Sequence, residues 1–377
     1  MNSTFSGANL SALRSHNAAL VLGLLRAAGE SGVSRLELAA HTGLTPQAVS
    51  KITSRLRAEG LAAEAGQRAS TGGKPRTVLR LVRDANSAVG LHLDRDELTV
   101  VLADLTGEPV AVRSAPFDFG ADPEWVVREA AAQVTALLAE TAAEGGYGPV
   151  LGVGVACPGP LDHGSGVLRR VTGLVHWDGF ALRSALAARL GGLPVLLDKD
   201  TNAAALGLAP RGARDTADSF AYLHLGTGLG AGLVLGGVLH RGARTGAGEF
   251  GHQVVRLDGP VCGCGNRGCV EALCLAAVAA GDPAEAARML GVGAANLVGL
   301  LDIDRVVLGG RTVLAADRLF VRGVEAVLAE RAARGDGRTV PVAVAGSGAR
   351  AVAEGAAQLI LAPLFGRPDG SFRDERM

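Results

Sequence analysis

The chain has 377 residues, 48% of them hydrophobic and 20% charged, and its 37 basic residues balance 37 acidic ones. This composition predicts a soluble globular protein with a sizeable core spread over two or three domains. Because no run of about 18 uncharged apolar residues occurs, a transmembrane helix is not expected. Residues 14–29 superficially resemble a signal peptide, but they lie inside the chain and their short apolar run ends at Arg26, so an amphipathic helix is predicted.

The charge is distributed unevenly along the chain. Residues 1–83 contain 11 Lys and Arg against 4 Asp and Glu, whereas the remainder contains 26 against 33. A small basic module before a larger acidic one favours a nucleic-acid-binding head, since basic side chains near phosphates release condensed counterions. A solvated charged surface is the alternative that charge alone leaves open.

Residues 35–58 show the pattern of two helices separated by a glycine turn. In the first helix Leu36, Leu38 and Ala39 are predicted to share one apolar face, which ends before Gly43. Thr45 then fits the N-cap position of a second helix, with Pro46 at the first helical position. This second helix is expected to bury three apolar side chains: Val49, Ile52 and Leu56.

The outward face of the second helix is polar and basic, which is how a helix-turn-helix presents side chains to a major groove. The alternating segment 60–82 follows and predicts a β-hairpin with a basic tip, so we expect a winged helix. The predicted DNA-contacting residues are Arg35, Thr45, Gln47, Ser50, Lys51, Ser54, Arg55, Arg68, Lys74 and Arg76. A protein-binding helical hairpin is the alternative.

The pattern changes to alternating strands and helices after the head. Three strands are predicted within 87–119, a helix over 122–144, and a buried strand from 149 that ends in a Gly-Pro loop. A similar order repeats in outline from residue 219. Two such halves predict a two-lobed α/β body whose ligands bind in a cleft at the carboxyl ends of strands. Such ends contain Asp94, Asp200, Gly226–Gly230 and Gly309–Gly310.

Three motifs make the sequence resemble a known family. "GTGLGAG" at 226–232, "RTGAGEFGH" at 244–252 and "CGCGNRGCVE" at 262–271, in that order and spacing, are similar to the ROK family of repressors, open reading frames and sugar kinases. The similarity runs from about Leu13 to about Phe365, and the winged head resembles the regulator branch, since the kinases lack it. The resemblance implies a winged helix-turn-helix followed by a two-lobed body of the actin-like, RNase H-like ATPase type.

The resemblance also implies a structural zinc ion. In ROK proteins the matching histidine and three cysteines bind zinc, so the ligands would be His252, Cys262, Cys264 and Cys269. Three thiolates and one imidazole complete a tetrahedron and leave no open position for a substrate. Clustered cysteines in a chain without a secretion signal favour metal ligation in the cytoplasm, with disulfides as the alternative. Cys157 and Cys274 are predicted to be buried apolar side chains.

For sugar binding the resemblance implies four polar side chains and one glycine: Gly159, Asp200, Glu249, His252 and Glu271. Asp200 matches the general base of the kinases, and solvated loop carboxylates are the alternative for the two glutamates. The family's asparagine before this aspartate is replaced by Lys199, which offers hydrogen-bond donors only and adds charge. This change, together with a shortened helical segment after Glu271, is expected to alter which sugar fits or to weaken sugar binding.

The turn that approaches the ATP phosphates in ROK kinases is altered here. The family's Asp-x-Gly-Gly-Thr turn corresponds to Asp94 followed by Arg95, Asp96 and Glu97. Two carboxylates facing a triphosphate are electrostatically unfavourable, and the glycines that permit close backbone approach are missing from the turn. ATP binding is therefore predicted to be lost or very weak, and the domain is not expected to be an enzyme.

The sequence thus predicts a sugar-responsive DNA-binding transcriptional regulator, a repressor of carbohydrate uptake or catabolism genes. Its expected partners are operator DNA, a sugar or sugar phosphate, and further copies of the chain in a homodimer or homotetramer, without a membrane. Two alternatives stay open. One is an active sugar kinase with an appended DNA-binding head, and the other is a DNA-binding regulator that has lost sugar sensing.

The predicted domains follow from these motifs. A winged helix covers residues 10–83, and a sugar-binding body covers 86–365. Within the body, lobe 1 is expected at 86–200 together with the C-terminal helix, and lobe 2 at 201–350. The polar residues 366–377 are expected to form a disordered tail. The linker around residues 80–90 is expected to pass ligand-driven lobe closure to the head.

Overall fold

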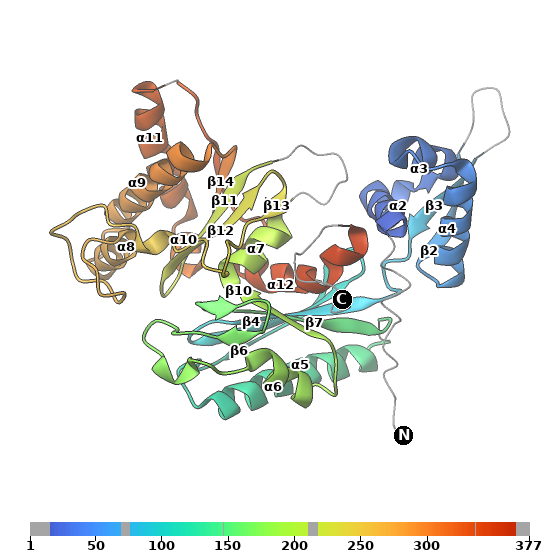
Figure 1. Ribbon diagram of the computed structural model, residues 1–377, viewed down its shortest axis with the longest axis horizontal. Coiled ribbons are helices and arrows are strands. Elements are labelled where there is room, and N and C mark those ends of the chain that lie inside the picture. The colour runs from blue at the N-terminus through green and yellow to red at the C-terminus, as the bar shows by residue number, and fades with distance from the viewer. Residues whose placement is uncertain (1–15, 69–75, 146, 210–217, 336, 367–377) are drawn as a thin grey trace.

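The computed structural model describes residues 16–68, 76–145, 147–209, 218–335 and 337–366. A small N-terminal head lies beside a two-lobed body, and each lobe contains a five-stranded sheet (Figure 1). The predicted fold class, a winged helix followed by a two-lobed α/β body, is confirmed. The tip of the predicted hairpin and the tail from residue 367 lie outside the described residues.

The head combines α-helices with a short sheet. The helices are α2 (His16–Ala28), α3 (Arg35–Thr42) and α4 (Pro46–Ala58). The sheet has the order β1 (Val33–Ser34), β3 (Arg76–Leu81) and β2 (Ala62–Arg68). Ser34 and Glu37 form a capping box at the start of α3, and Gly43 ends this helix in a left-handed conformation. Thr45 caps α4 by accepting a hydrogen bond from the backbone N–H of Ala48, as the sequence predicts.

Two side chains of the head lie differently from the prediction. Leu36 is 55% exposed whereas Leu38 is fully buried, because two residues along an α-helix turn by about 200° and cannot share one narrow face. On α4, Thr53 is buried while Ile52 is only partly so. The Thr53 hydroxyl donates to the carbonyl oxygen of Val49 at 2.9 Å, which satisfies this polar group inside the core.

Lobe 1 is a mixed sheet with helices packed on both faces. The strand order is β10 (Val195–Lys199), β7 (Val150–Cys157), β4 (Ser87–Leu93), β5 (Glu97–Asp104) and β6 (Pro109–Pro116). Helices α5 (Pro123–Ala143) and α6 (Leu182–Arg189) pack against its apolar side chains. Every residue of β4 is buried, as expected for a strand covered on both faces. A small hairpin of β8 (Leu161–Asp162) and β9 (Val167–Leu168) follows β7.

Lobe 2 repeats the five-stranded arrangement. The strand order is β13 (Val238–Leu239), β12 (Leu229–Leu235), β11 (Phe220–Leu225), β14 (Arg305–Gly309) and β15 (Val342–Val344). Its helices are α8 (Val270–Ala279), α9 (Pro283–Leu301), α10 (Arg311–Leu314) and α11 (Asp317–Ala333). Among the described helices, α9 is long and apolar enough to cross a membrane by length and composition alone. Half of its apolar window is buried against the rest of the lobe, as in a core helix.

Two helices cross between the sheets and join the lobes. Helix α7 (Asp200–Leu208) leaves lobe 1 at the end of β10, and α12 (Ala351–Leu361) packs against α7, β4 and β7. Glycines allow these backbones to touch. A Cβ atom at Gly154 of β7 would overlap the carbonyl oxygen of Ala356, and a Cβ atom at Gly355 would overlap that of Ala203. The crossing therefore tolerates no side chain at these positions.

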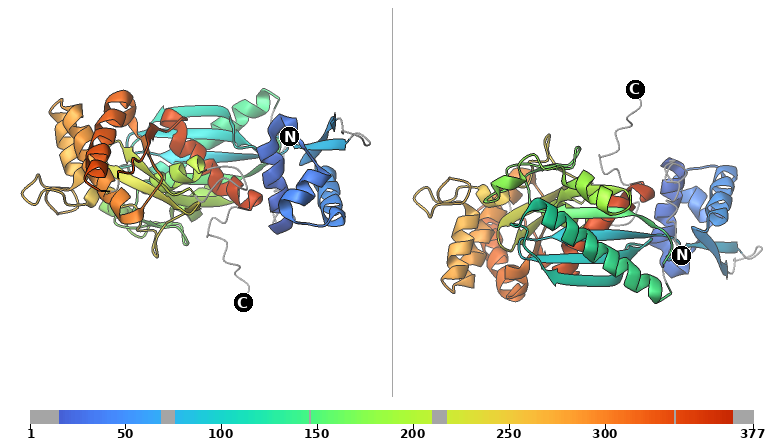
Figure 2. Two further views of the ribbon diagram at one scale, coloured as in Figure 1. Left: turned by 90° about the horizontal axis from the view of Figure 1, so that it is seen from above. Right: turned by 90° about the horizontal axis from the view of Figure 1, so that it is seen from below.

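The head and lobe 1 share one hydrophobic core. Leu22 and Leu25 of α2 belong to the same buried cluster as Ile360 of α12, and the Arg26 guanidinium lies 3.8 Å from the ring centroid of Phe365. Figure 2 shows the head at one end of the molecule, beside the end of α12. The predicted linker is hydrogen-bonded at both sides, through Val82 to Leu61 of the head and through Arg83 to Leu105 of lobe 1. It is therefore part of the fold.

We expect Gly154→Ala to destabilise the protein by more than about 4 kcal/mol, since neither backbone can yield to the added methyl group. Gly299→Ala on the exposed side of α9 is the matched control, because a methyl group there meets no atom within 4 Å and should stabilise the helix by about 0.5–1 kcal/mol. Thermal unfolding of both variants measures the difference. Equal melting temperatures would contradict the close crossing.

Candidate functional site

A cavity of about 150 Å³ lies between the lobes. Lobe 1 contributes the ends of β4, β7 and β10, and lobe 2 contributes the glycine turn after β11 and the residues around the cysteine cluster. The structure brings all five residues of the predicted sugar site to this cavity: Gly159, Asp200, Glu249, His252 and Glu271. Their role in sugar binding stays a prediction, but their convergence from separate segments of the chain is a property of the fold.

Two of the cavity carboxylates are held by backbone amides. Asp200 is the first residue of α7, and its Oδ1 accepts a hydrogen bond from the Thr201 N–H at 2.6 Å. Burial raises the pKa of Asp200, while the neighbouring His224 acts in the opposite direction. Glu271, in the first turn of α8, accepts a hydrogen bond from the Leu229 N–H at 2.7 Å. These bonds fix both side chains without help from a ligand.

Lys199 lies inside the cavity, where its side chain is 4% exposed. Its Nζ donates to the carbonyl oxygen of Ala247 at 2.5 Å and lies 3.1 Å from Oε1 of Glu249. Its methylene stem covers Gly159, because a Cβ atom at that glycine would come within 2.7 Å of the lysine Cδ. The lysine therefore occupies space beside the predicted sugar ligands and forms an ion pair with one of them.

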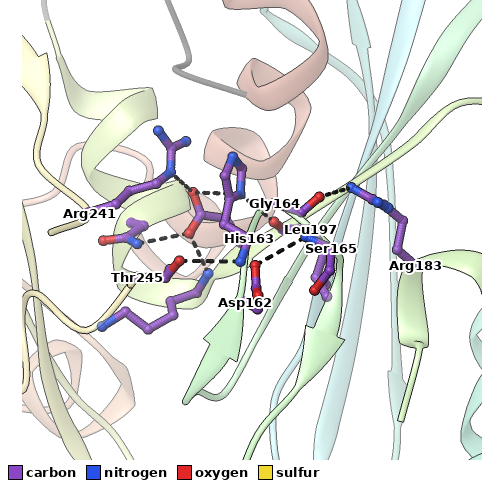
Figure 3. Close-up of polar contacts among 11 residues, drawn as sticks. Asp162, His163, Gly164, Ser165, Arg183, Leu197, Arg241 and Thr245 are labelled. Carbon is purple, nitrogen blue, oxygen red and sulfur yellow. Dashed lines mark hydrogen bonds and ion pairs between the residues drawn. The ribbon is translucent and has the colours of Figure 1, made fainter. Parts of the chain in front are cut away.

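Residues 240–249, which we call the strap, connect β13 of lobe 2 to Glu249 and are anchored on lobe 1. Arg241 Nε donates to Oδ2 of Asp198 at 2.7 Å, and the Asp198 side chain is fully buried. Thr245 accepts a hydrogen bond from the His163 N–H at 3.2 Å. Figure 3 shows both strap residues pointing toward His163. The positive φ of Thr245, 58°, is rare for a β-branched residue and is held by these contacts.

The four predicted metal ligands form one cluster. Their ligand atoms all lie within 4.8 Å of one another, with 3.7 Å between the Sγ atoms of Cys264 and Cys269 and 3.6 Å between Cys262 Sγ and His252 Nδ1. Sulfur atoms about 2.3 Å from a zinc ion at tetrahedral angles lie about 3.8 Å apart. The residues therefore fit a four-coordinate ion, and Nδ1 of the histidine is the atom that faces it.

The turn between β4 and β5 is bound by an arginine of the other lobe. Arg311 of α10 donates to both carboxylate oxygens of Asp96, at 2.7 and 2.5 Å, and its Nη2 lies 3.2 Å from Oδ2 of Asp94. This arginine lowers the pKa of Asp96. The bidentate pair joins lobe 1 to lobe 2.

A second cavity of about 350 Å³ lies next to this pair, and the sequence analysis did not find it. His92 of β4 lines it together with Tyr222 and His224 of β11, whose Oη and Nδ1 atoms lie 3.0 Å apart. His92 is 7% exposed, and burial lowers its pKa to about 4; His224 and Arg311 act in the same direction, while Asp94 opposes them. The two strands are far apart in sequence, so no spacing could have revealed this cluster.

The predicted DNA-contacting residues lie mainly on one exposed face of α4. Gln47, Ser50, Lys51 and Ser54 are exposed, and Arg55 is 41% exposed beside Glu59. Thr45 is an exposed cap, and Arg76 is exposed at the start of β3. Arg35 instead bridges the two helices, since its Nε donates to the Thr53 hydroxyl at 3.2 Å. The side chain of Arg68 and all of Lys74 lie outside the described residues.

Comparison with known proteins assigns the family. Residues 88–282, just over half of the chain, match the ROK family. With the two lobes, the cavity and the cysteine cluster in place, the chain belongs to the ROK family.

Named relatives agree with this assignment, and a solved structure shares the fold. The xylose repressor of Caldicellulosiruptor bescii is 32% identical over 241 residues, which cover 63% of this chain and 59% of that repressor. A putative xylose repressor of Caldicellulosiruptor sp. is 27% identical over 380 residues, covering 89% of this chain and 94% of the relative. The crystal structure of a ROK family transcriptional regulator, a homologue of the Escherichia coli MLC protein, has a TM-score of 0.72 at 22% identity over 93% of this chain and 98% of its own.

The cysteine cluster predicts a tightly bound metal ion that contributes to folding. We expect Cys264→Ser to lower both the metal content, measured by elemental analysis, and the melting temperature, and we expect a chelator to lower the melting temperature of the unaltered protein. Cys157→Ala removes a thiol outside the cluster and should leave the metal content unchanged. Identical melting with and without chelator would contradict a structural metal.

The buried His92 predicts a dependence of stability on pH. The folded pKa of about 4 lies below the usual value of about 6.5, so between these pH values only the unfolded chain binds the proton. The free energy of unfolding should therefore fall as the pH decreases through this window, by about 2 kcal/mol from this group between pH 7 and pH 5. Urea unfolding of the protein and of His92→Gln at pH 7 and at pH 5 measures this loss of unfolding free energy. The same loss in both proteins would contradict a lowered pKa of His92 as its cause.

Proposed function

We propose that the protein is a sugar-responsive DNA-binding transcriptional repressor whose kinase-like body senses an effector without phosphorylating it. The head binds operator DNA through α4 and the wing, and the cavity between the lobes binds the effector. The names of the relatives, xylose repressors and a ROK transcriptional regulator, support this assignment. The observation that carries it is the exposed polar and basic face of α4 in a winged helix fused to a sugar-kinase-like body.

Helix α4 has the composition and the placement of a recognition helix. Its buried side, with Val49 and Leu56, packs into the head, so Gln47, Ser50 and Lys51 remain free to reach base edges and phosphates. Gln47 and Ser50 can donate and accept hydrogen bonds in a major groove, and Lys51 can contact a phosphate. A dimer would place two such helices on the halves of a palindromic operator.

The shared core between head and body supports coupling between effector and DNA. Helix α12 contacts the crossing helix α7 at one side and leads to η5 (Ala362–Phe365), which packs on α2 of the head. A change in lobe closure that shifts α12 would therefore move α2, in addition to any change passed through residues 82–86. The effector can shift this equilibrium only by its difference in affinity for the two lobe arrangements.

The turn at residues 94–97, which is held by Arg311, supports a body that no longer acts as a kinase. Asp96 and Glu97 place negative charge where the triphosphate would lie, and Arg311 is engaged by Asp94 and Asp96. Asp200, which matches the general base of the kinases in sequence, lines the cavity, and we propose that its carboxylate accepts a hydrogen bond from a sugar hydroxyl. A coupled ATP-consumption assay with a panel of hexoses tests the loss of kinase activity. ATP turnover with any of these hexoses would support the alternative of an active sugar kinase.

We infer that the clustered histidine and cysteines hold zinc as a structural ion. The donor set of three thiolates and one imidazole suits a closed zinc site. The ion would tie η3 (Phe250–His252), which follows Glu249, to Cys269, which precedes Glu271. Zinc would thereby fix the two glutamates of the cavity relative to each other.

We expect Lys51→Ala and Gln47→Ala each to weaken operator binding about tenfold or more, because one phosphate contact or one base contact is lost. An operator selected from a random DNA pool by the unaltered protein supplies the probe for gel-shift titration. The salt dependence of binding should become shallower for Lys51→Ala only.

Arg334→Ala is the control, since it removes an exposed cation that follows the end of α11 and pairs with Glu330 in the body. Its operator affinity should equal that of the unaltered protein. Unchanged affinity for both head variants would show that α4 is not the recognition helix.

A further inference from the structure

The central strand of each five-stranded sheet carries a histidine near its carboxyl end. The sequence Leu-His-Leu occurs twice, at 91–93 in β4 and at 223–225 in β11. Because side chains alternate along a strand, His92 points to the same face as Gly90, against which α12 packs. His92 and His224 thus come from corresponding strands of the two lobes, and both line the second cavity of about 350 Å³.

One of these histidines lacks a partner. Tyr222 Oη and His224 Nδ1 form a hydrogen bond of 3.0 Å. Nε2 of His92 has no hydrogen-bond partner within the described residues, although only 7% of this residue is exposed. Burial lowers the pKa of His92 to about 4, so at neutral pH its imidazole is uncharged and has one N–H donor and one acceptor nitrogen. Such a buried group is destabilising until a hydrogen-bonding partner meets it.

The charges around the second cavity disfavour an ionic ligand. Among its described lining residues Arg311 is the one fixed cation, and the carboxylates of Asp94 and Asp96 already bind it. Glu97 adds a further carboxylate to the lining. A phosphate or carboxylate would therefore meet an excess of negative charge. A cation would lose its hydration beside His92, which stays neutral and offers no opposite charge.

The remaining lining is largely apolar, and its size suits two fused rings. Leu314, Ala315 and Val352 line the cavity together with the ring of Tyr222. An apolar cavity of about 150 Å³ holds one benzene molecule, so about 350 Å³ has room for a two-ring molecule. The rings of Tyr222 and His92 favour an aromatic ligand, because pairs of aromatic rings gain energy beyond the burial of their area.

We propose that the second cavity binds an uncharged two-ring aromatic molecule with one hydrogen-bonding group, which contacts the imidazole of His92. The inference goes beyond the proposed function, which assigns no ligand to this cavity. The rings occupy the apolar part of the lining, and the polar group supplies the partner that the buried imidazole lacks. Asp94 and His224 also line the first cavity, so the two sites are neighbours.

Calorimetric titration of the full chain at pH 7 tests the proposal. The neutral probes are indole, 2-naphthol and naphthalene, the last of which has no hydrogen-bonding group. Three charged probes complete the set: 2-naphthoate as an anion, 2-naphthylmethylamine as a cation, and ATP. We expect 2-naphthol or indole to bind at least tenfold tighter than each charged probe. Naphthalene should bind about fivefold more weakly than 2-naphthol, because it leaves His92 without a partner.

Two variants locate the site. Ala315→Trp places a large ring at an exposed position of the lining, where no core residue has to move, and should weaken 2-naphthol binding at least tenfold. Ala333→Trp is the matched control, since this alanine is exposed at the end of α11 and does not line the cavity. His92→Phe keeps a ring but removes both nitrogens, so 2-naphthol should lose its advantage over naphthalene.

Every other outcome counts against the proposal. Tighter binding of ATP, 2-naphthoate or the amine than of both indole and 2-naphthol would overturn the ligand class. Unchanged affinity in Ala315→Trp would mean that the probes bind elsewhere. If neither indole nor 2-naphthol showed saturable binding at millimolar concentration, the site assignment itself would be wrong.

Discussion

The crossing of α7 and α12 between the two sheets is the contact on which the rest of the structure depends. Their backbones meet each other and the sheets at glycines, among them Gly154 and Gly355, where a side chain would collide with a carbonyl oxygen. This close approach brings the ends of β7 and β10 near the loops of lobe 2. The cavity residues consequently come from both lobes and face one space. Without the glycines the lobes could not lie close enough for either cavity to form.

Charged pairs then tie the lobes together. Arg241 of the strap reaches Asp198, Lys199 reaches Glu249, and Arg311 reaches Asp94 and Asp96. Each pair joins residues that are at least 43 positions apart in the chain. Side chains of the protein itself therefore supply opposite charges between the lobes.

The head is coupled to this body through a buried interface. Leu22 and Leu25 of α2 pack in the same cluster as Ile360 and Phe365, so α12 connects the crossing between the lobes with the head. Head and body therefore share apolar surface that neither could expose to water without cost. A flexible linker would only limit the distance between head and body, whereas a shared core also fixes the orientation of the head relative to the body.

The sequence by itself determined the order of the modules, the cysteine cluster and the residue types of the candidate site. Caps and turns such as Thr45 with Pro46 are local, and the cysteine spacing is confined to ten residues, so both can be recognised without knowledge of the fold. It could not place Thr53 in the core or Leu36 at the surface, because helix faces depend on what packs against them. Only the tertiary structure decided that Lys199 pairs with Glu249, that Arg311 meets Asp96, and that His92 joins Tyr222, because these contacts depend on how two separate sheets are brought together.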